Sequence, residues 1–486
     1  MFFIFDKMDI GDKMNQFDVP LFEALRKHNE KKPISLHVPG HKNGLLLQST
    51  PFFQEILDID VTELTNLDDL HSPEGAILEA EQLLADAYKA ERSFFLVNGS
   101  TVGNLAMMMA TLKKGDIAFI QRNCHKSVLN GIELTGAQPV LLGPEQHEDC
   151  GVAGGVSLDT IRKAYTLYPE CKAIILTYPN YYGITFNLKE IIQFAHEKHI
   201  PVLIDEAHGA HFIGGEYFPP SAVELGADVV VQSAHKTLPA MTMGSFLHVN
   251  SEYVSIESVN HYLRILQSSS PSYPIMASLD LARSYIGTFE KEDEHFLKET
   301  IEAFKKELKT LDFVKVLEFP IHQGDPLKLT LQSRCDKTGF ELQRIFEEKG
   351  IYTEMADPNN VLLVLPLLKK NMLFPFDEIM EQLRAINLTA IQEDRKNVYF
   401  YKEKISTLHR EHSNQEEYVP IANAENSICA DTIIPYPPGV PLLLKGEMIT
   451  KEDVKGLTHL LNSGARFQGG QQLTQGMLKI FSQKEI

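Results

Sequence analysis

Short β-rich runs without polar alternation recur between residues 93 and 232, and they constrain the fold more than any other feature. The runs are SFFLV (93–97), IAFI (117–120), PVLL (139–142), AIILT (173–177), PVLI (201–204) and DVVVQ (228–232). Helices are expected between them, near 101–112, from 126 and near 187–198. Strands without polar alternation are typical of a parallel sheet that helices cover on both faces. The pattern predicts an α/β domain with a doubly wound, mostly parallel sheet.

After this region the pattern changes to that of a smaller α+β domain. It predicts one long helix over 276–311, a strand at 326–331, and helices near 340–349 and 376–386. Residues 388–418 are charged and weakly periodic, which indicates a linker or an exposed helix. The block IIPYPPGVPLLLKGE near the end contains four prolines, so it is expected to be extended. We therefore divide the chain into an N-terminal arm (1–50, of which 1–13 are left out of the fold), a major domain (51–285) and a C-terminal α+β domain (286–486).

Composition excludes several classes of function. The chain has 46 Lys and Arg against 65 Asp and Glu, a net charge of −19, which does not suit non-specific binding to nucleic acid. Its five cysteines form no C-x-x-C pair, and no apolar run approaches the roughly 18 residues of a membrane span. We expect a cytoplasmic protein without a structural metal, a nucleic-acid partner or a membrane anchor.

Polar residues follow the predicted strands at their carboxyl ends, where ligands bind in parallel α/β sheets. Gly99-Ser100-Thr101, between a strand and a helix, offers two hydroxyls and the positive end of a helix dipole. That combination suits one phosphate group. The alternative is that Ser100 and Thr101 simply cap the helix.

The segment Asp205-Glu206-Ala207-His208 spells DEAH, a string found in some helicases. No glycine in the chain is followed by lysine, so the phosphate loop that a helicase needs is absent. Asp205, His208 and His211 could alternatively bind a metal, although their spacing suits a helix better than a strand end.

Lys236 follows a buried strand, behind Ser233 and His235, which places it to enter a cleft. Most lysines are surface charges. Here, however, a phosphate cradle, the Asp205 carboxylate and this lysine are expected at one edge of the sheet. Pyridoxal phosphate needs these three groups: a lysine for the Schiff base, a carboxylate for the pyridine nitrogen and a cradle for the phosphate.

Eight segments make a resemblance to a known family specific. They are HVPGHKNG (37–44), DVTELTNLDDLHSPEG (60–75), LVNGSTVGN (96–104), RNCHKSV (122–128), DEAHGAHF (205–212), QSAHKTLPAMTMGS (232–245), SSSPSYPIMASLD (268–280) and ADTIIPYPPGVPLLLKGE (430–447). Together they resemble the Orn/Lys/Arg decarboxylase family, within the aminotransferase-like branch (fold type I) of pyridoxal-phosphate enzymes. The likeness is to the short bacilli-type members, which lack the N-terminal wing domain of the large inducible enzymes.

The resemblance implies a role for each matching residue. Lys236 is expected to form the Schiff base, Asp205 to pair with the pyridine nitrogen and His125 to stack on the ring. Ser100, Thr101, Ser233 and His235 are expected as phosphate ligands and neighbours of the lysine. His208 is expected beside the cofactor, at a position where the large inducible enzymes carry an aromatic residue. Ser268 is expected to reach the phosphate of a neighbouring subunit, so the active site would belong to a homodimer.

The resulting hypothesis is a pyridoxal-phosphate-dependent decarboxylase that converts a basic amino acid (lysine, arginine or ornithine) into CO2 and an amine used in polyamine synthesis. Lys236 or His235 would return the proton to Cα. The rival hypotheses are another pyridoxal-phosphate reaction (aldolase or aminotransferase) and a non-catalytic cofactor-binding protein. Asp431 and Glu447, which flank the proline-rich block, are candidates to bind the distal cation of the substrate, because a desolvated cation needs a carboxylate. The alternative is that they are surface acids on a docking strand.

Overall fold

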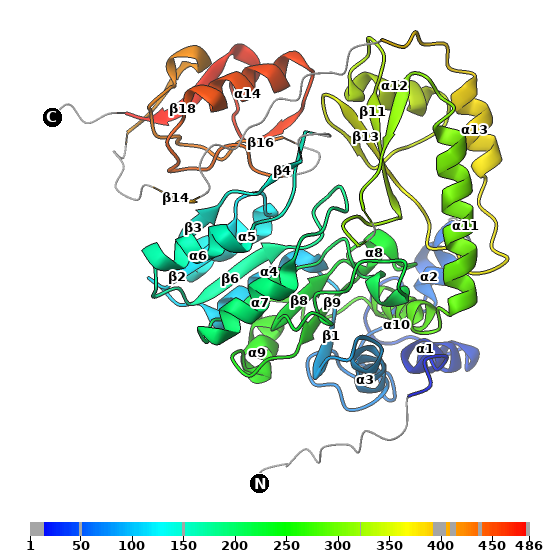
Figure 1. Cartoon of the computed structure of the whole chain (residues 1–486). Helices are drawn as coiled ribbons and strands as arrows, with labels where there is room; N and C mark the ends of the chain where they lie inside the picture. Colours follow the sequence, from blue (N-terminus) through cyan, green and yellow to red (C-terminus); the bar gives the residue numbers. More distant parts are fainter. Residues whose placement is uncertain are drawn as a thin grey trace.

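The computed structural model describes residues 14–47, 51–147, 151–320, 322–391, 405–408, 415–435 and 440–482. Its largest element is an eight-stranded sheet in the order β1-β9-β8-β7-β6-β2-β3-β14 (Figure 1). These strands are β1 (Arg92–Leu96), β2 (Ile117–Gln121), β3 (Gln138–Leu142), β6 (Ala173–Thr177), β7 (Val202–Asp205), β8 (Val229–Gln232), β9 (Ser245–Val249) and β14 (Ile405–Thr407). The neighbours β8, β7, β6, β2 and β3 are parallel, whereas β9 and β14 run antiparallel to the strands beside them. The mostly parallel α/β sheet is confirmed.

Helices cover both faces of this sheet. Alternate side chains of each strand point to opposite faces, so neighbouring residues of one strand pack against different helices. On one face Phe94 and Leu203 pack with helices α4, α5 and α9. On the other face Phe95 and Ile204 pack with α3, α6, α7 and α10. The helices of this part are α1 (Pro20–Glu30), α2 (Gln54–Leu57), α3 (Ala76–Tyr88), α4 (Gly99–Thr111), α5 (Lys126–Thr135), α6 (Leu158–Leu167), α7 (Leu188–Glu197), α8 (Ala234–Thr237), α9 (Ile256–Leu266) and α10 (Tyr273–Gly287). Strand β4 (Gln146–His147) pairs antiparallel with β5 (Val152–Ala153).

The single long helix expected over 276–311 is wrong. The structure has two helices there, α10 and α11 (Lys291–Leu308). The chain breaks because Glu290 starts α11 as its N-cap: its side chain accepts a hydrogen bond from the Asp293 backbone, and its own N–H donates to Asp293 Oδ2 at 3.0 Å. This reciprocal capping arrangement satisfies two backbone N–H groups at the start of α11.

The expectation of a linker or an exposed helix over 388–418 is also corrected in part. Residues 405–407 form β14, which extends the main sheet beside β3, and residues 416–420 form another strand. Residues 392–404 and 409–414 lie outside the described part of the chain.

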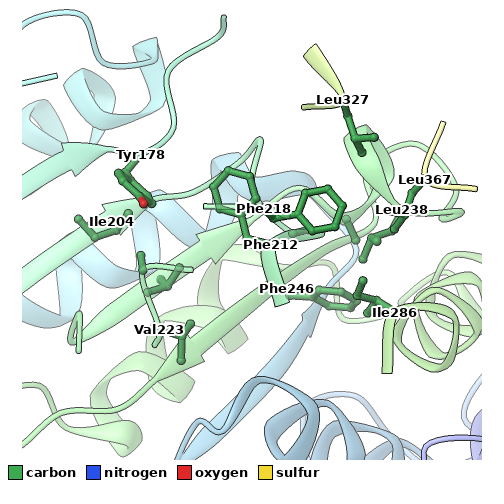
Figure 2. Packing of buried hydrophobic residues seen from close by; sticks show 14 of the residues in the cluster. Tyr178, Ile204, Phe212, Phe218, Val223, Leu238, Phe246, Ile286, Leu327 and Leu367 are labelled. Carbon is green, nitrogen blue, oxygen red and sulfur yellow. The ribbon is translucent and has the colours of Figure 1, made fainter. Parts of the chain in front are cut away.

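A second, antiparallel sheet follows in the order β10-β11-β13-β12. Its strands are β10 (Val314–Leu317), β11 (Lys328–Ser333), β12 (Met355–Ala356) and β13 (Asn360–Val364), with helices α12 (Gly339–Glu348) and α13 (Phe376–Arg384). Leu327 and Leu367 from this unit share one buried cluster with Phe218, Leu238 and Ile286 (Figure 2). Strand β11 is therefore held against the carboxyl edge of the main sheet.

The last segment has a core of its own, which includes Ile421, Leu443 and Leu457. Its elements are β15 (Glu416–Pro420), β16 (Ile434–Pro435), α14 (Lys451–Asn462), β17 (Phe467–Gln468) and β18 (Met477–Phe481). Within the proline-rich block, residues 434–435 form a short strand, which agrees with the expected extended backbone, and residues 436–439 lie outside the described part. This core is distinct from the cluster that Leu327 and Leu367 join. The predicted boundaries at 50 and 285 stay predictions.

Candidate active site

A cavity of about 270 Å³ opens at the carboxyl ends of the parallel strands. Eight of the eleven residues that the sequence singled out line it: Ser100, Thr101, His125, Asp205, His208, Ser233, His235 and Lys236. They come from segments spread over more than 130 residues, and the parallel sheet brings them together because its strand ends share one edge.

Lys236 lies on the short helix α8, directly after β8. Its Nζ is 3.2 Å from His208 Nε2 and 5.4 Å from the centre of the Tyr181 ring. Burial lowers the pKa of this amine below its ordinary value, while the carboxylates of Asp205 and Glu354 act in the opposite direction. The lowered pKa increases the fraction of neutral, nucleophilic amine near neutral pH.

Asp205 is the last residue of β7, and its carboxylate is buried. Its Oδ2 accepts a hydrogen bond from Asn104 Nδ2 at 2.9 Å, and its Oδ1 accepts one from the Ala207 N–H at 3.2 Å. The next residue, Glu206, does not line the cavity, and its carboxylate accepts hydrogen bonds from Ser221 and Gln232. Of this adjacent acidic pair, Asp205 alone lines the cavity.

His125 caps the start of α5. Its Nδ1 accepts from the Ser127 N–H at 3.2 Å and lies 2.8 Å from Ser127 Oγ. A neutral ring that accepts at Nδ1 carries its proton on Nε2. Burial lowers the pKa of the imidazole, against the opposing charge of Asp205, so the neutral form is favoured.

The first turn of α4 is the segment predicted to be an anion cradle. Gly99, with φ of +80°, lets the backbone turn into this helix, and Ser233 Oγ donates to Ser100 Oγ at 2.8 Å. The N-cap residue is Asn98, so the alternative in which Ser100 or Thr101 caps the helix is wrong. In the described part of the chain no side chain caps this turn. Its N–H groups are available to an anion in the cavity.

His235 lies beside Lys236 with its Nδ1 2.9 Å from the carbonyl oxygen of Gly244. Nδ1 therefore donates, and Nε2 of the neutral ring keeps a lone pair. Burial lowers the pKa of this imidazole, and the charge of Lys236 adds to that shift.

Ser268 is exposed and does not line the cavity. Its N–H donates to Asn98 Oδ1 at 3.2 Å, and its carbonyl oxygen is 2.8 Å from His71 Nε2. The residue thus lies beside the cradle of its own chain. Its expected contact with the phosphate of a neighbouring subunit stays a prediction.

Asp431 and Glu447 do not line the cavity either. Glu447 forms an ion pair with Arg122 at 2.8 Å and accepts from the Leu444 N–H at 2.9 Å. Asp431 accepts backbone hydrogen bonds from Thr432 and Gly470, both at 2.8 Å. Because both carboxylates already have partners that fix the C-terminal segment, the structure gives no support to their expected role in substrate binding.

The proline-rich block does approach the site. A second cavity, of about 170 Å³, shares Tyr181 with the first and is lined by Pro435, Val440 and Leu442 from that block. Asn180 and Asp357 supply polar groups to it. Part of this block therefore lies beside the cleft, whereas the acids that flank it are paired with other groups.

Three residues that the sequence analysis missed complete the site: Asn104, Tyr181 and Lys328. Lys328 is buried, and its Nζ is 2.7 Å from His208 Nδ1 and 2.8 Å from the Tyr181 carbonyl oxygen. Burial lowers its pKa to about 8. The sequence did indicate Lys328: it is the one charged residue of the predicted strand PLKLTL, and a charged group in a buried strand requires polar partners.

The described residues contain no group of three or more His, Cys, Asp or Glu side chains arranged to hold a metal ion. The three side chains considered as metal ligands have other partners: Asp205 bonds to Asn104, His208 to Lys328, and His211 to Asp325. Within the described ranges, no helix has the length and apolarity needed to cross a membrane.

Two family models match this chain. Residues 19–324 match the major domain of Orn/Lys/Arg decarboxylase, and residues 392–484 match its C-terminal domain. Among curated relatives, the uncharacterized protein YaaO of Bacillus subtilis is 44% identical over 96% of this chain and 99% of that protein. The arginine decarboxylase of Bacillus subtilis is 30% identical over 97% of this chain and 99% of its own length.

Solved structures show the same fold. The Escherichia coli constitutive lysine decarboxylase matches with a TM-score of 0.75 at 20% identity, over 96% of this chain and 82% of that chain. Serine palmitoyltransferase of Sphingomonas wittichii matches with a TM-score of 0.52 at 17% identity, over 76% of this chain and 84% of that chain. At these identities the structural matches establish the fold alone.

Proposed function

The chain belongs to the Orn/Lys/Arg decarboxylase family, and we propose that it is a pyridoxal-phosphate-dependent carboxy-lyase that converts a basic amino acid into CO2 and the corresponding amine. The observation that carries this proposal is that Lys236, Asp205 and the uncapped start of α4 line one cavity. The cavity supplies a reactive amine, an acid and an anion site, the three groups that this cofactor requires.

The residues present fit the cofactor. The first-turn N–H groups of α4 with Ser100, Thr101 and Ser233 would hold the phosphate, Asp205 the pyridine nitrogen, and Lys236 the aldehyde carbon. Thr177 Oγ1 and Asn104 Oδ1 are buried polar atoms without a hydrogen-bond partner, and Thr177 lines the cavity. Unpaired buried polar atoms are costly, so their presence here supports a polar ligand.

When bound, pyridoxal phosphate supplies an electron sink for the electron pair that departing CO2 leaves on Cα. Asn104 orients the Asp205 carboxylate, and Ser127 fixes the His125 ring through Nδ1. Lys236 Nζ can return a proton to Cα after CO2 leaves, and His235 Nε2 can do so once its lone pair has taken up a proton.

We propose arginine, lysine and ornithine as the substrate panel, with arginine first. Arginine comes first because the match to an arginine decarboxylase reaches 30% identity, against 25% for the lysine decarboxylase LdcA of Pseudomonas aeruginosa. The product of any of the three is a polyamine or its precursor, so the proposed role is polyamine biosynthesis. The proposed location is the cytoplasm.

We also propose a homodimer. The described residues 34–47 and 52 include a group of exposed large apolar side chains: Ile34, Leu36, Val38, Leu45, Leu46 and Phe52. Large apolar side chains that gather at the surface are typical of an interaction surface. A second copy of the chain would cover it, consistent with the shared active site inferred from the family resemblance.

The test is product analysis with purified full-length protein and added pyridoxal phosphate. We expect CO2 and the matching amine from at least one of the three amino acids, and no product from Lys236→Ala. A 2-oxo acid instead of CO2 would indicate an aminotransferase, and an aldehyde from a β-hydroxy amino acid would indicate an aldolase. Bound cofactor with no turnover of any of these substrates would indicate a non-catalytic protein.

A further inference from the structure

His208 lies between two lysine amines. Its Nε2 is 3.2 Å from Lys236 Nζ, and its Nδ1 is 2.7 Å from Lys328 Nζ. His208 belongs to the loop after β7 of the main sheet, whereas Lys328 is the first residue of β11 in the antiparallel sheet. His208 and Lys328 are 3% and 4% exposed, so water does not compete effectively for these contacts. The imidazole therefore connects the residue proposed to hold the cofactor with a lysine 92 positions later in the sequence.

The partners of Lys328 determine which nitrogen of His208 carries the proton. Lys328 also donates to the Tyr181 carbonyl oxygen at 2.8 Å, which holds its Nζ in place. With a pKa of about 8, Lys328 is mostly an ammonium group at neutral pH and can only donate hydrogen bonds. Burial keeps the pKa of His208 well below its ordinary value, and the charge of Lys328 acts in the same direction, so the ring is neutral. A neutral ring that accepts at Nδ1 carries its hydrogen on Nε2.

The Nε2–H group faces the Lys236 amine. An N–H donor at 3.2 Å is favourable when the amine offers a lone pair and unfavourable when the amine is a protonated donor. The contact therefore favours the neutral form of Lys236, in the same direction as its burial. The neutral amine is the form that reacts with an aldehyde.

We propose that Lys328 is a positioning residue: its hydrogen bond to Nδ1 fixes His208 in the Nε2–H tautomer, and this tautomer holds the Lys236 amine in its neutral, aldehyde-reactive form. The inference rests on the proposed function in one respect only, that Lys236 is the residue that captures the cofactor.

The other charged groups around these residues act differently. Asp205 and Glu354 raise the pKa of Lys236, and Asp325 and Glu354 raise that of Lys328. His125 and His211 add to the lowering of the His208 pKa. Lys328 is the residue described as hydrogen bonded to His208 Nδ1. Replacing Lys328 therefore tests whether this bond sets the tautomer.

The rate of cofactor capture measures the neutral fraction of Lys236. The amine lone pair forms the bond to the aldehyde carbon, and the carbonyl oxygen leaves as water with the two amine protons. The full-length chain is stripped of cofactor, mixed with pyridoxal phosphate for short times between pH 6 and 10, and reduced with borohydride. Mass spectrometry then quantifies the cofactor on the peptide that contains Lys236.

We expect Lys328→Met to slow capture about tenfold near pH 7 and to leave it unchanged near pH 10, which corresponds to a rise of about one unit in the Lys236 pKa. Lys328→Arg keeps a charged donor and should restore most of the rate. Lys369→Met is the matched control: Lys369 lies in the same C-terminal part, bonds to Thr288 at 2.9 Å and has no contact with His208, so this variant should behave as wild type.

Two results would overturn the proposal. One is a Lys328→Met profile identical to wild type. The other is an equal slowing by Lys328→Met in a His208→Leu background, which would show that charge acts directly and not through the imidazole. If Lys328→Met does not fold, nitrogen spectra of the ¹⁵N-histidine-labelled wild type still decide, because a proton on Nδ1 of His208 would contradict the inference. Capture on another lysine, or in Lys236→Ala, would instead contradict the proposed function.

Discussion

Asn104 Nδ2 on α4 donates a 2.9 Å hydrogen bond to Asp205 Oδ2 at the end of β7. The same amide group donates to Ser127 Oγ at 2.9 Å, and Ser127 in turn contacts His125 Nδ1. One buried amide thus connects the side chain expected at the pyridine nitrogen with the side chain expected to stack on the ring. Asn104 lies one helical turn beyond the phosphate cradle on the same helix, so α4 positions the cradle and the carboxylate together.

We predict that Asn104→Ala retains covalently bound cofactor but lowers kcat by about 10- to 100-fold. A hydrogen bond to a charged group contributes about 1.5–3 kcal/mol, and each 1.4 kcal/mol corresponds to a factor of ten. The measurement is kcat for CO2 release together with cofactor content from visible absorbance. Asn130→Ala, on the exposed side of α5, is the control. An unchanged kcat would show that Asp205 keeps its orientation without the amide.

The stability of the protein should depend on His248. This residue of β9 is buried between Ser93 and Gln232, at 2.8 Å and 3.0 Å, and burial lowers its pKa to about 3. The unfolded chain binds a proton near pH 6.5 that the folded chain does not, so the free energy of unfolding decreases as pH falls from 6.5 toward 3. By pH 5 the loss should reach about 2 kcal/mol.

Urea unfolding at pH 7, 6 and 5 checks this prediction, with His248→Gln as the comparison because glutamine can hydrogen bond but does not titrate. The variant should be less stable at pH 7 and should lose about 2 kcal/mol less than wild type on acidification. Parallel pH dependence in the two proteins would assign the acid sensitivity to other groups.

The ion pair between Arg122 and Glu447 should stabilise the C-terminal segment and leave substrate binding unaffected. Arg122 follows β2 and also donates to the carbonyl oxygens of Pro441 and Leu442 at 2.8 and 2.9 Å. Removing one partner of a largely buried pair leaves a charge unpaired, so Glu447→Gln should cost about 2 kcal/mol of stability. We expect faster proteolysis between residues 415 and 482 and an unchanged KM.

A double-mutant cycle with Arg122→Met isolates the pair, and the loss in the double mutant should be smaller than the sum of the single losses. If Glu447 instead binds the distal cation of the substrate, as the sequence suggested, Glu447→Gln should weaken substrate binding. A large rise in KM for the basic amino acid with unchanged stability would restore Glu447 as a substrate ligand.

The sequence could predict the parts of the site that follow local rules. Asp205 and Lys236 each come directly after an apolar strand, and the sheet rule alone places both at one edge. Lys328 could not be placed in this way, because its contact with His208 depends on how a second sheet docks against the first. The break between α10 and α11 was missed because Glu290 is an unusual N-cap and the residues on either side continue a helical pattern. The pairing of Glu447 with Arg122 likewise joins residues 325 positions apart, which no local pattern reveals.

The last prediction is that Ser268 contributes to the active site of the neighbouring subunit and not to that of its own chain. Within one chain, the Ser268 N–H is bonded to Asn98 beside the cradle, whereas the family resemblance implies that Ser268 serves the site of the neighbouring subunit.

Inactive Lys236→Ala chains are mixed with inactive Ser268→Glu chains, whose added charge would repel a phosphate. If Ser268 acts across the dimer, half of the dimers are hybrids and each has one intact site, so about a quarter of wild-type activity should return. If Ser268 acts within its own chain, every hybrid site lacks one residue and no activity returns. The assay is CO2 release after exchange of subunits, with each single variant mixed with itself as the control.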